Sequence, residues 1–273
     1  MQTDLIKISV ISLLNFIVFG LLAPVTAPRL LELGASHTVV GTIAAVNVGL
    51  LVLTGPVVGS WSDLRGRKFV VFITSAISAI CYILMGLTTS LTAVFILKIV
   101  FGFVEHTPIL NKAIIGDVLP KEKHRSAYIS IGVTTSLGII IGPIIGGHLV
   151  EVENGFFYVC TLAAVICIMI IGITQTFPEK KKKETKASEP TNLKKEFLKI
   201  FVELLNVDWK TFGDALYLRF ILSLSVITYF TNQTMYLSEK YDLPKKSIGY
   251  IIALFGALGN RKIKNHLNLY QST

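Results

Sequence analysis

The sequence is poor in charge, in proline and in cysteine. Only 16% of its 273 residues are charged, and it has 9 prolines and 3 cysteines. Soluble domains carry about a quarter charged residues, so this composition argues against an ordinary soluble protein. Apolar residues make up 52% of the chain and lie in long continuous runs rather than in alternation. Such runs predict membrane-spanning helices and argue against a β-barrel.

The three cysteines indicate neither disulfides nor a metal site. Cys81, Cys160 and Cys167 are odd in number, lie inside apolar runs and show no CxxC spacing, so we expect packing residues, no metal and no cofactor. The net charge is +9, but the basic residues fall between the apolar runs rather than along one soluble face. This pattern argues against a nucleic-acid partner and for the lipid bilayer.

Taking about 20 apolar residues per span, we expect eight membrane spans. They cover residues 5–30, 38–58, 69–88, 91–115, 126–150, 157–177, 215–236 and 247–260. A cleaved signal peptide is the alternative for the first run, but the run is long for that purpose and contains Asn15, Gly20 and Pro24. We therefore interpret it as the first membrane helix.

Basic residues gather in the connections after the second, fourth and sixth spans. These are Arg65, Arg67 and Lys68, then Lys121, Lys123 and Arg125, and then the lysines between residues 180 and 199. Because positively charged loops remain in the cytoplasm, we expect a multi-pass protein with a cytoplasmic N-terminus. Which membrane it occupies stays open.

Residues 178–213 form the longest polar stretch. Its first part is a block of lysines, which repel one another and stay solvated. Its second part places Phe197, Ile200, Phe201 and Leu204 at helical spacing, which predicts an amphipathic helix on the inner leaflet. A plain basic linker is the alternative that we favour over specific lipid recognition.

A short motif follows the second span and reads GSWSDLRGRK, from Gly59 to Lys68. An acid, a glycine and paired bases in so short a hairpin predict a tight turn with a charge latch. The motif resembles the signature loop of the major facilitator superfamily, GxxxD(R/K)xGR(R/K), and departs from it only at Leu64. The resemblance implies a gating loop made of Gly59, Asp63, Gly66, Arg67 and Lys68, in which Asp63 engages a helix of the other half of the transporter. An ordinary positive-inside loop is the alternative.

The fifth span carries glycines four residues apart, which let another helix approach closely, and a proline that bends the helix. The motif consists of Gly138, Gly142, Pro143, Gly146 and Gly147. It is similar to the family's GxxxGPxxGG motif, best known from proton-coupled antiporters. A general packing face of small residues remains the alternative.

The fourth span carries charges that recur every seven residues, at Lys98, Glu105 and Lys112. This spacing predicts that they share one helix face toward a cavity or a partner. Lys98-Ile-Val-Phe-Gly102 resembles the family's RxxxG motif with lysine in place of arginine, so Glu105 or His106 is the candidate titrating group. A Lys–Glu pair that only holds helices together is the alternative. Asn15 and Asn47 are further candidates for a substrate or proton pathway.

A DxxP sequence begins at Asp117. Together with it, these motifs most resemble the branch of the superfamily called major facilitator superfamily domain-containing protein 9, near the tetracycline-resistance-like transporters. The resemblance implies an all-α membrane protein with the major facilitator fold. We expect a complete N-terminal six-helix bundle (1–177), a basic cytoplasmic linker (178–213), the first two helices of an incomplete C-terminal bundle (214–260) and an atypical polar tail (261–273). The chain is expected to be truncated.

The resemblance implies secondary active transport of a small organic solute by alternating access, with proton coupling as a candidate property. The alternative is a non-transporting regulator or assembly partner of a full-length relative. A membrane enzyme is the weakest hypothesis, because the sequence has neither HExxH nor GxSxG. The substrate, the coupling direction and the oligomeric state stay open.

Overall fold

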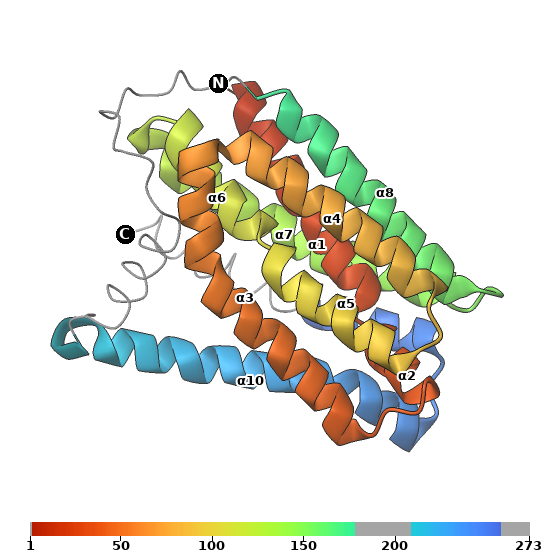
Figure 1. The fold of residues 1–273 in the computed structure, drawn as a ribbon. Coiled ribbons are helices and arrows are strands. Elements are labelled where there is room, and N and C mark those ends of the chain that lie inside the picture. The colour runs from red at the N-terminus through yellow and green to blue at the C-terminus, as the bar shows by residue number, and fades with distance from the viewer. Residues whose placement is uncertain (1, 178–208, 258–273) are drawn as a thin grey trace.

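The chain folds into helices that pack as a bundle, with one long helix beside it (Figure 1). A computed structural model describes residues 2–177 and 209–257, and these ranges contain no strand. The first half comprises α1 (Gln2–Leu22), α2 (Thr26–Glu32), α3 (His37–Arg65), α4 (Arg67–Leu87), α5 (Leu91–Val104), α6 (Thr107–Val118), α7 (Lys121–Leu149) and α8 (Gly155–Gln175). Then come α10 (Trp209–Tyr241) and a last helix over residues 245–257.

Six stretches within the described residues are long and apolar enough to cross a bilayer. They are Thr3–Glu32, His37–Arg65, Arg67–Leu87, Leu91–Val118, Lys121–Leu149 and Gly155–Gln175, and each matches one of the first six expected spans. A helix of 20 residues is about 30 Å long, the thickness of the hydrocarbon layer. The expected span 215–236 lies within α10, and 247–260 overlaps the helix over residues 245–257.

Two of the expected spans are interrupted, and a proline explains each interruption. α1 ends at Leu22, two residues before Pro24, and α5 ends at Val104, four residues before Pro108. A proline ring clashes with the carbonyl of the residue four positions earlier and donates no hydrogen bond. The continuous helices that we expected over 5–30 and 91–115 are therefore each divided in two.

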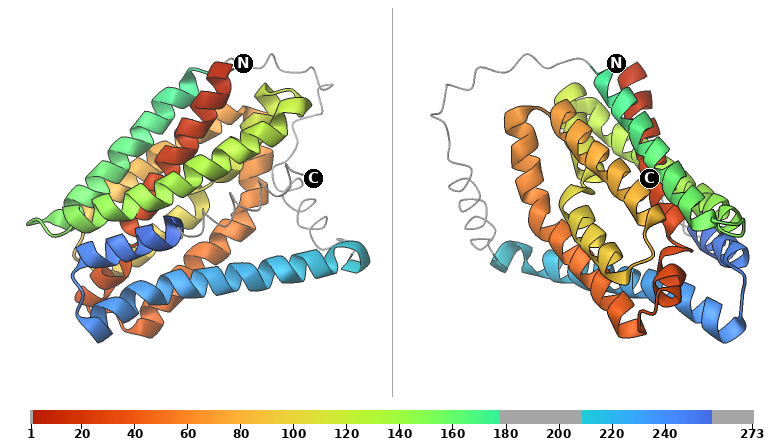
Figure 2. Two further views of the ribbon diagram at one scale, coloured as in Figure 1. Left: turned by 180° about the vertical axis from the view of Figure 1, so that it is seen from behind. Right: turned by 45° about the vertical axis from the view of Figure 1, so that its right-hand side comes forward.

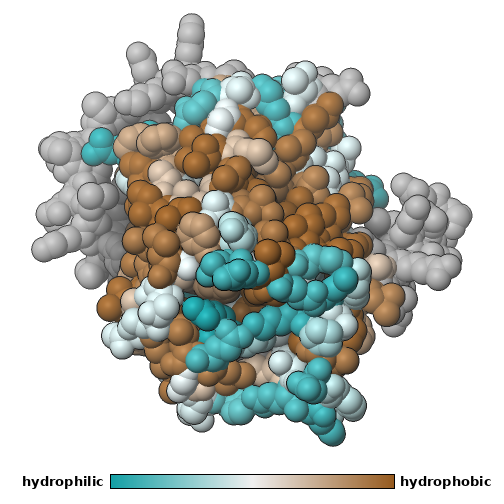
Figure 3. All heavy atoms as spheres, turned by 90° about the vertical axis from the view of Figure 1, so that its right-hand side faces the viewer, coloured by the Kyte–Doolittle hydropathy of each residue, from teal (hydrophilic) through white to brown (hydrophobic). Residues whose placement is uncertain are grey.

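The bundle is organised around α1, which packs against α7, α8 and α6, while α4 packs against α8 and α3 against α5. The largest fully buried side chains include Ile8, Leu21, Met85, Phe101 and Leu110. Many large apolar side chains are nevertheless exposed, and brown apolar atoms cover much of the face in Figure 3, with polar atoms gathered across its lower half. This surface fits a lipid environment, and the protein is a multi-pass membrane protein.

The long helix α10 meets the bundle at one end only. Its closest packing is against α2. Figures 1 and 2 show it approaching the bundle near its Tyr241 end and diverging from it toward its Trp209 end. The amphipathic helix and lysine block expected within 178–208, and the polar tail 261–273, lie outside the described residues.

Candidate functional site

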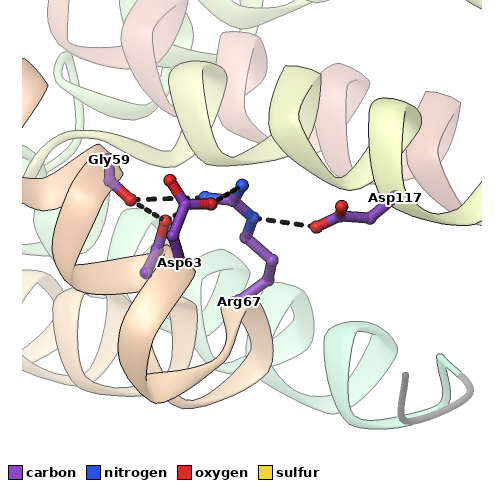
Figure 4. Close-up of polar contacts among 5 residues, drawn as sticks. Gly59, Asp63, Arg67 and Asp117 are labelled. Carbon is purple, nitrogen blue, oxygen red and sulfur yellow. Dashed lines mark hydrogen bonds and ion pairs between the residues drawn. The ribbon is translucent and has the colours of Figure 1, made fainter. Parts of the chain in front are cut away.

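The motif between the second and third spans forms a network centred on Arg67 (Figure 4). α3 ends at Arg65 and α4 begins at Arg67, so Gly66 alone connects them, with a φ of 98° that favours glycine. The tight turn expected from the sequence is therefore present. It brings the guanidinium of Arg67 back over the last turns of α3.

The guanidinium of Arg67 has partners on two helices. Nη2 forms an ion pair with Asp63, Nη1 donates to Gly59 O at 3.3 Å and to Ser62 Oγ, and Nε donates to Asp117 Oδ2 at 3.0 Å. Ser62 Oγ in turn donates to Gly59 O at 2.6 Å. Because Asp117 lies in the last turns of α6, this network joins the second span to the fourth.

Lysines at the same end of the bundle bind the end of the sixth span. Lys68 Nζ donates to Gln175 O at 3.1 Å, and Lys7 Nζ donates to Thr176 O at 3.0 Å. The side chain of Asp63 is 62% exposed, whereas that of Arg67 is only 18% exposed. Asp63 is thus the accessible member of the network, and its contact with a helix of the other half stays a prediction.

A cavity of about 420 Å³ lies inside the bundle, lined by residues of α1 to α6, α8 and α10. Four of the sequence-predicted pathway residues line it, namely Asn15, Asn47, Lys98 and Glu105. The structure adds Ser75, Ser78, Tyr82 and Thr234 to its polar lining. The remaining lining is largely apolar, which is typical of pockets that bind small organic molecules.

Within this cavity Glu105 and Lys98 have different partners. Tyr82 donates its hydroxyl to Glu105 Oε1 at 2.5 Å. Lys98 Nζ lies 5.5 Å from the ring centroid of Phe101, and Lys98 has no carboxylate within 4.0 Å among the described residues. The alternative interpretation, a Lys98–Glu105 pair that holds helices together, therefore has no counterpart in this structure.

Close packing of α5 on α3 positions Lys98. A Cβ on Gly102 would lie 3.0 Å from Asn47 O, so only glycine permits this approach. Asn47 Nδ2 then donates to the backbone carbonyl of Lys98 at 2.8 Å. Asn47 thus orients the backbone that presents Lys98.

His106 is fully buried and lies beside the cavity rather than in its lining. Thr54 Oγ1 lies 2.8 Å from Leu50 O, 2.9 Å from Gly102 O and 2.8 Å from His106 Nε2. Since a hydroxyl has one hydrogen, Thr54 donates to one of these three atoms, and the tautomer of His106 decides whether Nε2 donates to Thr54 or accepts from it. Nδ1 of His106 is buried without a partner among the described residues.

The seven-residue spacing of Lys98, Glu105 and Lys112 does not place them on one helix face. The helix is interrupted between Val104 and Thr107, so the phase of α6 does not continue that of α5. Lys98 and Glu105 share the cavity, whereas Lys112 is exposed and does not line it. The expectation of one shared face was wrong because it assumed a continuous helix.

The glycines of α7 allow close contact with α1. A Cβ on Gly138 would lie 2.8 Å from Phe16 Cβ, and one on Gly142 would lie 2.7 Å from Gly20 Cα. Gly146 is equally close to the backbone of Leu21. The motif therefore acts as the packing face that its spacing predicted.

The opposite side of the same motif faces the last helix. A Cβ on Gly147 would lie 2.9 Å from Lys245 O and 3.1 Å from Lys246 Cα, and Pro143 O approaches Gly249. Tyr250 Oη lies 2.9 Å from His148 Nε2. Pro143 and Gly147 thus belong to a contact between the first six spans and the helix over residues 245–257.

Further polar contacts join the first bundle to α10 and to the start of the helix over residues 245–257 at this end. His37 Nε2 lies 2.8 Å from both carboxylate oxygens of Glu239, and Lys245 forms an ion pair with Glu32. Glu32 also accepts from Arg29 at 3.2 Å. The end of the bundle opposite Arg67 is therefore tied to the second half of the chain.

Sequence reasoning missed several residues of the site. Asp117 was read as part of a helix-ending DxxP motif, and the available signal was that the ends of the second and fourth spans are expected on the same side of the membrane. Tyr82, Ser75 and Thr54 lie in apolar runs, where isolated polar residues are the signal that they need a partner. Which partner each one finds depends on helix packing that the sequence does not display.

Comparison with known proteins gives a consistent assignment. The family model described as Major Facilitator Superfamily matches residues 8–260. The tetracycline resistance protein, class H, of Pasteurella multocida is 25% identical over 265 residues, which cover 94% of this chain and 64% of that protein. The quinolone resistance protein NorA of Staphylococcus aureus is 23% identical over 252 residues, which cover 90% and 62%. The chain thus spans less than two thirds of the length of these relatives.

Solved structures share the fold. The nucleoside transporter NupG superimposes with a TM-score of 0.69 at 16% identity, over 98% of this chain and 68% of that chain. A bacterial homologue of the human lysosomal transporter Spinster, in an inward-facing and unoccupied conformation, gives a TM-score of 0.62 at 15% identity. That match covers 94% of this chain and 59% of the other. The first is named a transporter, and the second is named a homologue of one.

Proposed function

Because the chain belongs to the major facilitator superfamily, we propose that it carries out secondary active transport of a small organic solute by alternating access. The observation that carries this proposal is the cavity of about 420 Å³ with its largely apolar lining and its two charged residues, Lys98 and Glu105. Its volume falls in the range of about 300–1,000 Å³ typical of small-molecule sites. A non-transporting partner of a longer relative would need no such cavity.

Proton coupling is the finer part of the proposal, and Glu105 is its best candidate. A carboxyl group in the membrane interior costs free energy, and its presence there therefore marks a candidate functional site. Glu105 lines the cavity and accepts from Tyr82, whereas His106 is enclosed beside Thr54. Glu105 therefore stands where a solute and a proton can both reach it.

The arrangement of α10 supports an inward-facing state. Contacts such as His37–Glu239 close the end of the bundle opposite Arg67, and α10 diverges toward the end that carries Arg67 (Figure 2). Basic residues at that end, among them Lys68 and Lys123, favour its cytoplasmic location. The cavity would then open to the cytoplasm. A cysteine at Lys123 should react with a membrane-impermeant reagent from the cytoplasmic side only, and one at Glu153 only from the other side; the reverse pattern would contradict this topology.

Transport is tested with the purified chain in proteoliposomes under an imposed pH gradient. Tetracycline and a quinolone are the first solutes to test, because relatives are named for resistance to them. We expect gradient-dependent flux that Glu105→Gln abolishes and Glu151→Gln, at an exposed loop carboxylate, preserves. Flux that Glu105→Gln leaves unchanged would remove the coupling role but keep transport.

The signature loop gives a second test. Asp63 is the exposed member of the Arg67 network, so Asp63→Asn should slow exchange while leaving solute binding intact. Equal rates of exchange for Asp63→Asn and the unmodified chain would contradict a gating role for this loop.

A further inference from the structure

We infer that the cavity recognises an organic anion, an apolar molecule with one acidic group, and that Lys98 binds the negative charge. This inference deepens the proposed function and rests on the same cavity. Its basis is a pair of donors in the lining, namely Lys98, which has no carboxylate within 4.0 Å among the described residues, and Ser75, whose buried hydroxyl has no hydrogen-bond partner there.

Lys98 is a cation without a counter-charge. It lies on α5, within a membrane span, and lines the cavity. No carboxylate of the described residues lies within 4.0 Å of it, and its Nζ lies 5.5 Å from the centroid of the Phe101 ring. A charge in the membrane interior normally has a partner. An anionic ligand would supply the missing partner.

Ser75 provides a second donor that needs a ligand. Ser75 is only 3% exposed and lines the cavity from α4, and its Oγ has no hydrogen-bond partner among the described residues. A buried hydroxyl without a partner costs free energy. A carboxylate or sulfonate oxygen accepts from both a hydroxyl and an ammonium group.

The carboxylate of Glu105 does not replace the ligand as partner of Lys98. Its Oε1 accepts from Tyr82 at 2.5 Å, and Lys98 lies beyond ion-pair distance from it. Two further donors of the lining are occupied, since Asn47 donates to Lys98 O and Thr26 donates to Leu22 O. The free donors therefore favour a ligand that brings acceptors and negative charge.

The rest of the lining describes the body of the ligand. Aromatic and aliphatic side chains from α1, α2 and α3 surround the polar groups, among them Phe16, Phe19, Leu22, Leu30 and Leu51. Such a surface favours an aromatic or branched hydrocarbon over a sugar or a nucleotide, whose hydroxyls would stay unpaired. The site thus suits a carboxylate or sulfonate carried on an apolar ring system.

Three probes with the same ring system but different charges test how the charge of the ligand affects binding. They are 2-naphthoate, its neutral amide and 2-naphthylmethylammonium. Each is radiolabelled and titrated onto the chain in nanodiscs. Binding to empty nanodiscs is subtracted, because the probes also partition into lipid. We expect the anion to bind about tenfold more tightly than the amide, as a charge-assisted hydrogen bond provides. The cation should bind more weakly than both.

Substitutions then assign the preference to Lys98. Lys98→Gln should abolish the preference for the anion, while Lys98→Arg keeps it and shows that the fold tolerates change at this position. Lys123→Gln, which removes an exposed lysine at the end of the bundle, should leave the preference unchanged. Ser75→Ala should weaken anion binding a few-fold while raising the unfolding temperature of the empty protein, a combination that a purely structural serine would not give.

The outcomes separate the two proposals. If the amide or the cation binds as tightly as the anion, or if Lys98→Gln retains the preference, the anion inference fails while the cavity remains a solute site and transport can still be measured. If none of the three probes binds to the unmodified chain, the inference fails together with the assignment of this cavity as the solute site.

Discussion

His37 and Glu239 are 202 residues apart in sequence, yet His37 Nε2 lies 2.8 Å from both oxygens of the Glu239 carboxylate. This contact joins the start of α3 to the last turn of α10. Together with Glu32–Lys245 and His148–Tyr250, it ties the first six spans to the second half at the end opposite Arg67. The proposed alternating access would require these contacts to separate at this end.

Weakening this contact should open the cavity to that side more often. Both side chains are about half exposed, so we expect the contact to contribute no more than an exposed ion pair does, about 0.2–1 kcal/mol. We expect Glu239→Gln to raise the rate at which a membrane-impermeant maleimide reacts with Cys167 from that side by about two- to fivefold. Cys167 is the native cysteine that lines the cavity.

The control for this measurement is Glu153→Gln, which neutralises an exposed carboxylate in the connection between α7 and α8. A cysteine-free background with Cys167 restored ensures that Cys81 and Cys160 do not contribute. Identical reaction rates for Glu239→Gln and Glu153→Gln would show that the contact does not hold this end closed.

Arg67→Lys should destabilise the bundle more than the same change at Arg65. The guanidinium of Arg67 binds groups on α3 and α6 at once, which the single ammonium of lysine cannot do. The side chain of Arg67 is largely buried, so we expect a loss of about 1–3 kcal/mol in the free energy of unfolding. Arg65 is exposed at the end of α3 and should tolerate lysine. Thermal unfolding in detergent measures both, and equal unfolding temperatures would contradict the network.

Gly142→Ala should separate α7 from α1. The new Cβ would lie 2.7 Å from Gly20 Cα, a backbone atom that cannot turn away, so we expect a cost of about 1–3 kcal/mol or more. Gly132→Ala is the matched control, because Gly132 lies on the same helix and a Cβ there would meet no atom within 4 Å. That change should be neutral or slightly stabilising. The packing argument fails if Gly142→Ala lowers the unfolding temperature no more than Gly132→Ala does.

Thr54→Val should destabilise the junction between α5 and α6. The substitution keeps the shape but leaves His106 Nε2 without its partner, next to an Nδ1 that already has none. An unsatisfied buried polar group costs about 1–3 kcal/mol. Thr42→Val on the same helix removes an exposed hydroxyl that bonds only within its own helix, and it should change the unfolding temperature little. The prediction fails if the two valine variants unfold at the same temperature.

The sequence alone determined the solvent and the family. Long apolar runs between basic loops predicted the first six spans, because spanning helices need about 20 apolar residues whatever they pack against. Local motifs predicted the tight turn at Gly66 and the small-residue face from Gly138 to Gly146, since both depend on residues close together in the chain. Asn15, Asn47, Lys98 and Glu105 were named from their polarity within apolar runs, and all four line one cavity.

Tertiary structure decided which of these groups meet. The interruption at Pro108 set α6 out of phase with α5, which placed Lys112 outside the cavity that Lys98 and Glu105 share. Arg67 and Asp117 are 50 residues apart, Glu105 and Tyr82 are 23 apart, and His37 and Glu239 are 202 apart. Only the docking of whole helices brings these pairs into contact. The bilayer selects apolar residues for every span alike, so hydrophobicity specifies that a helix crosses the membrane, while the choice of its neighbours depends on side-chain packing between distant segments.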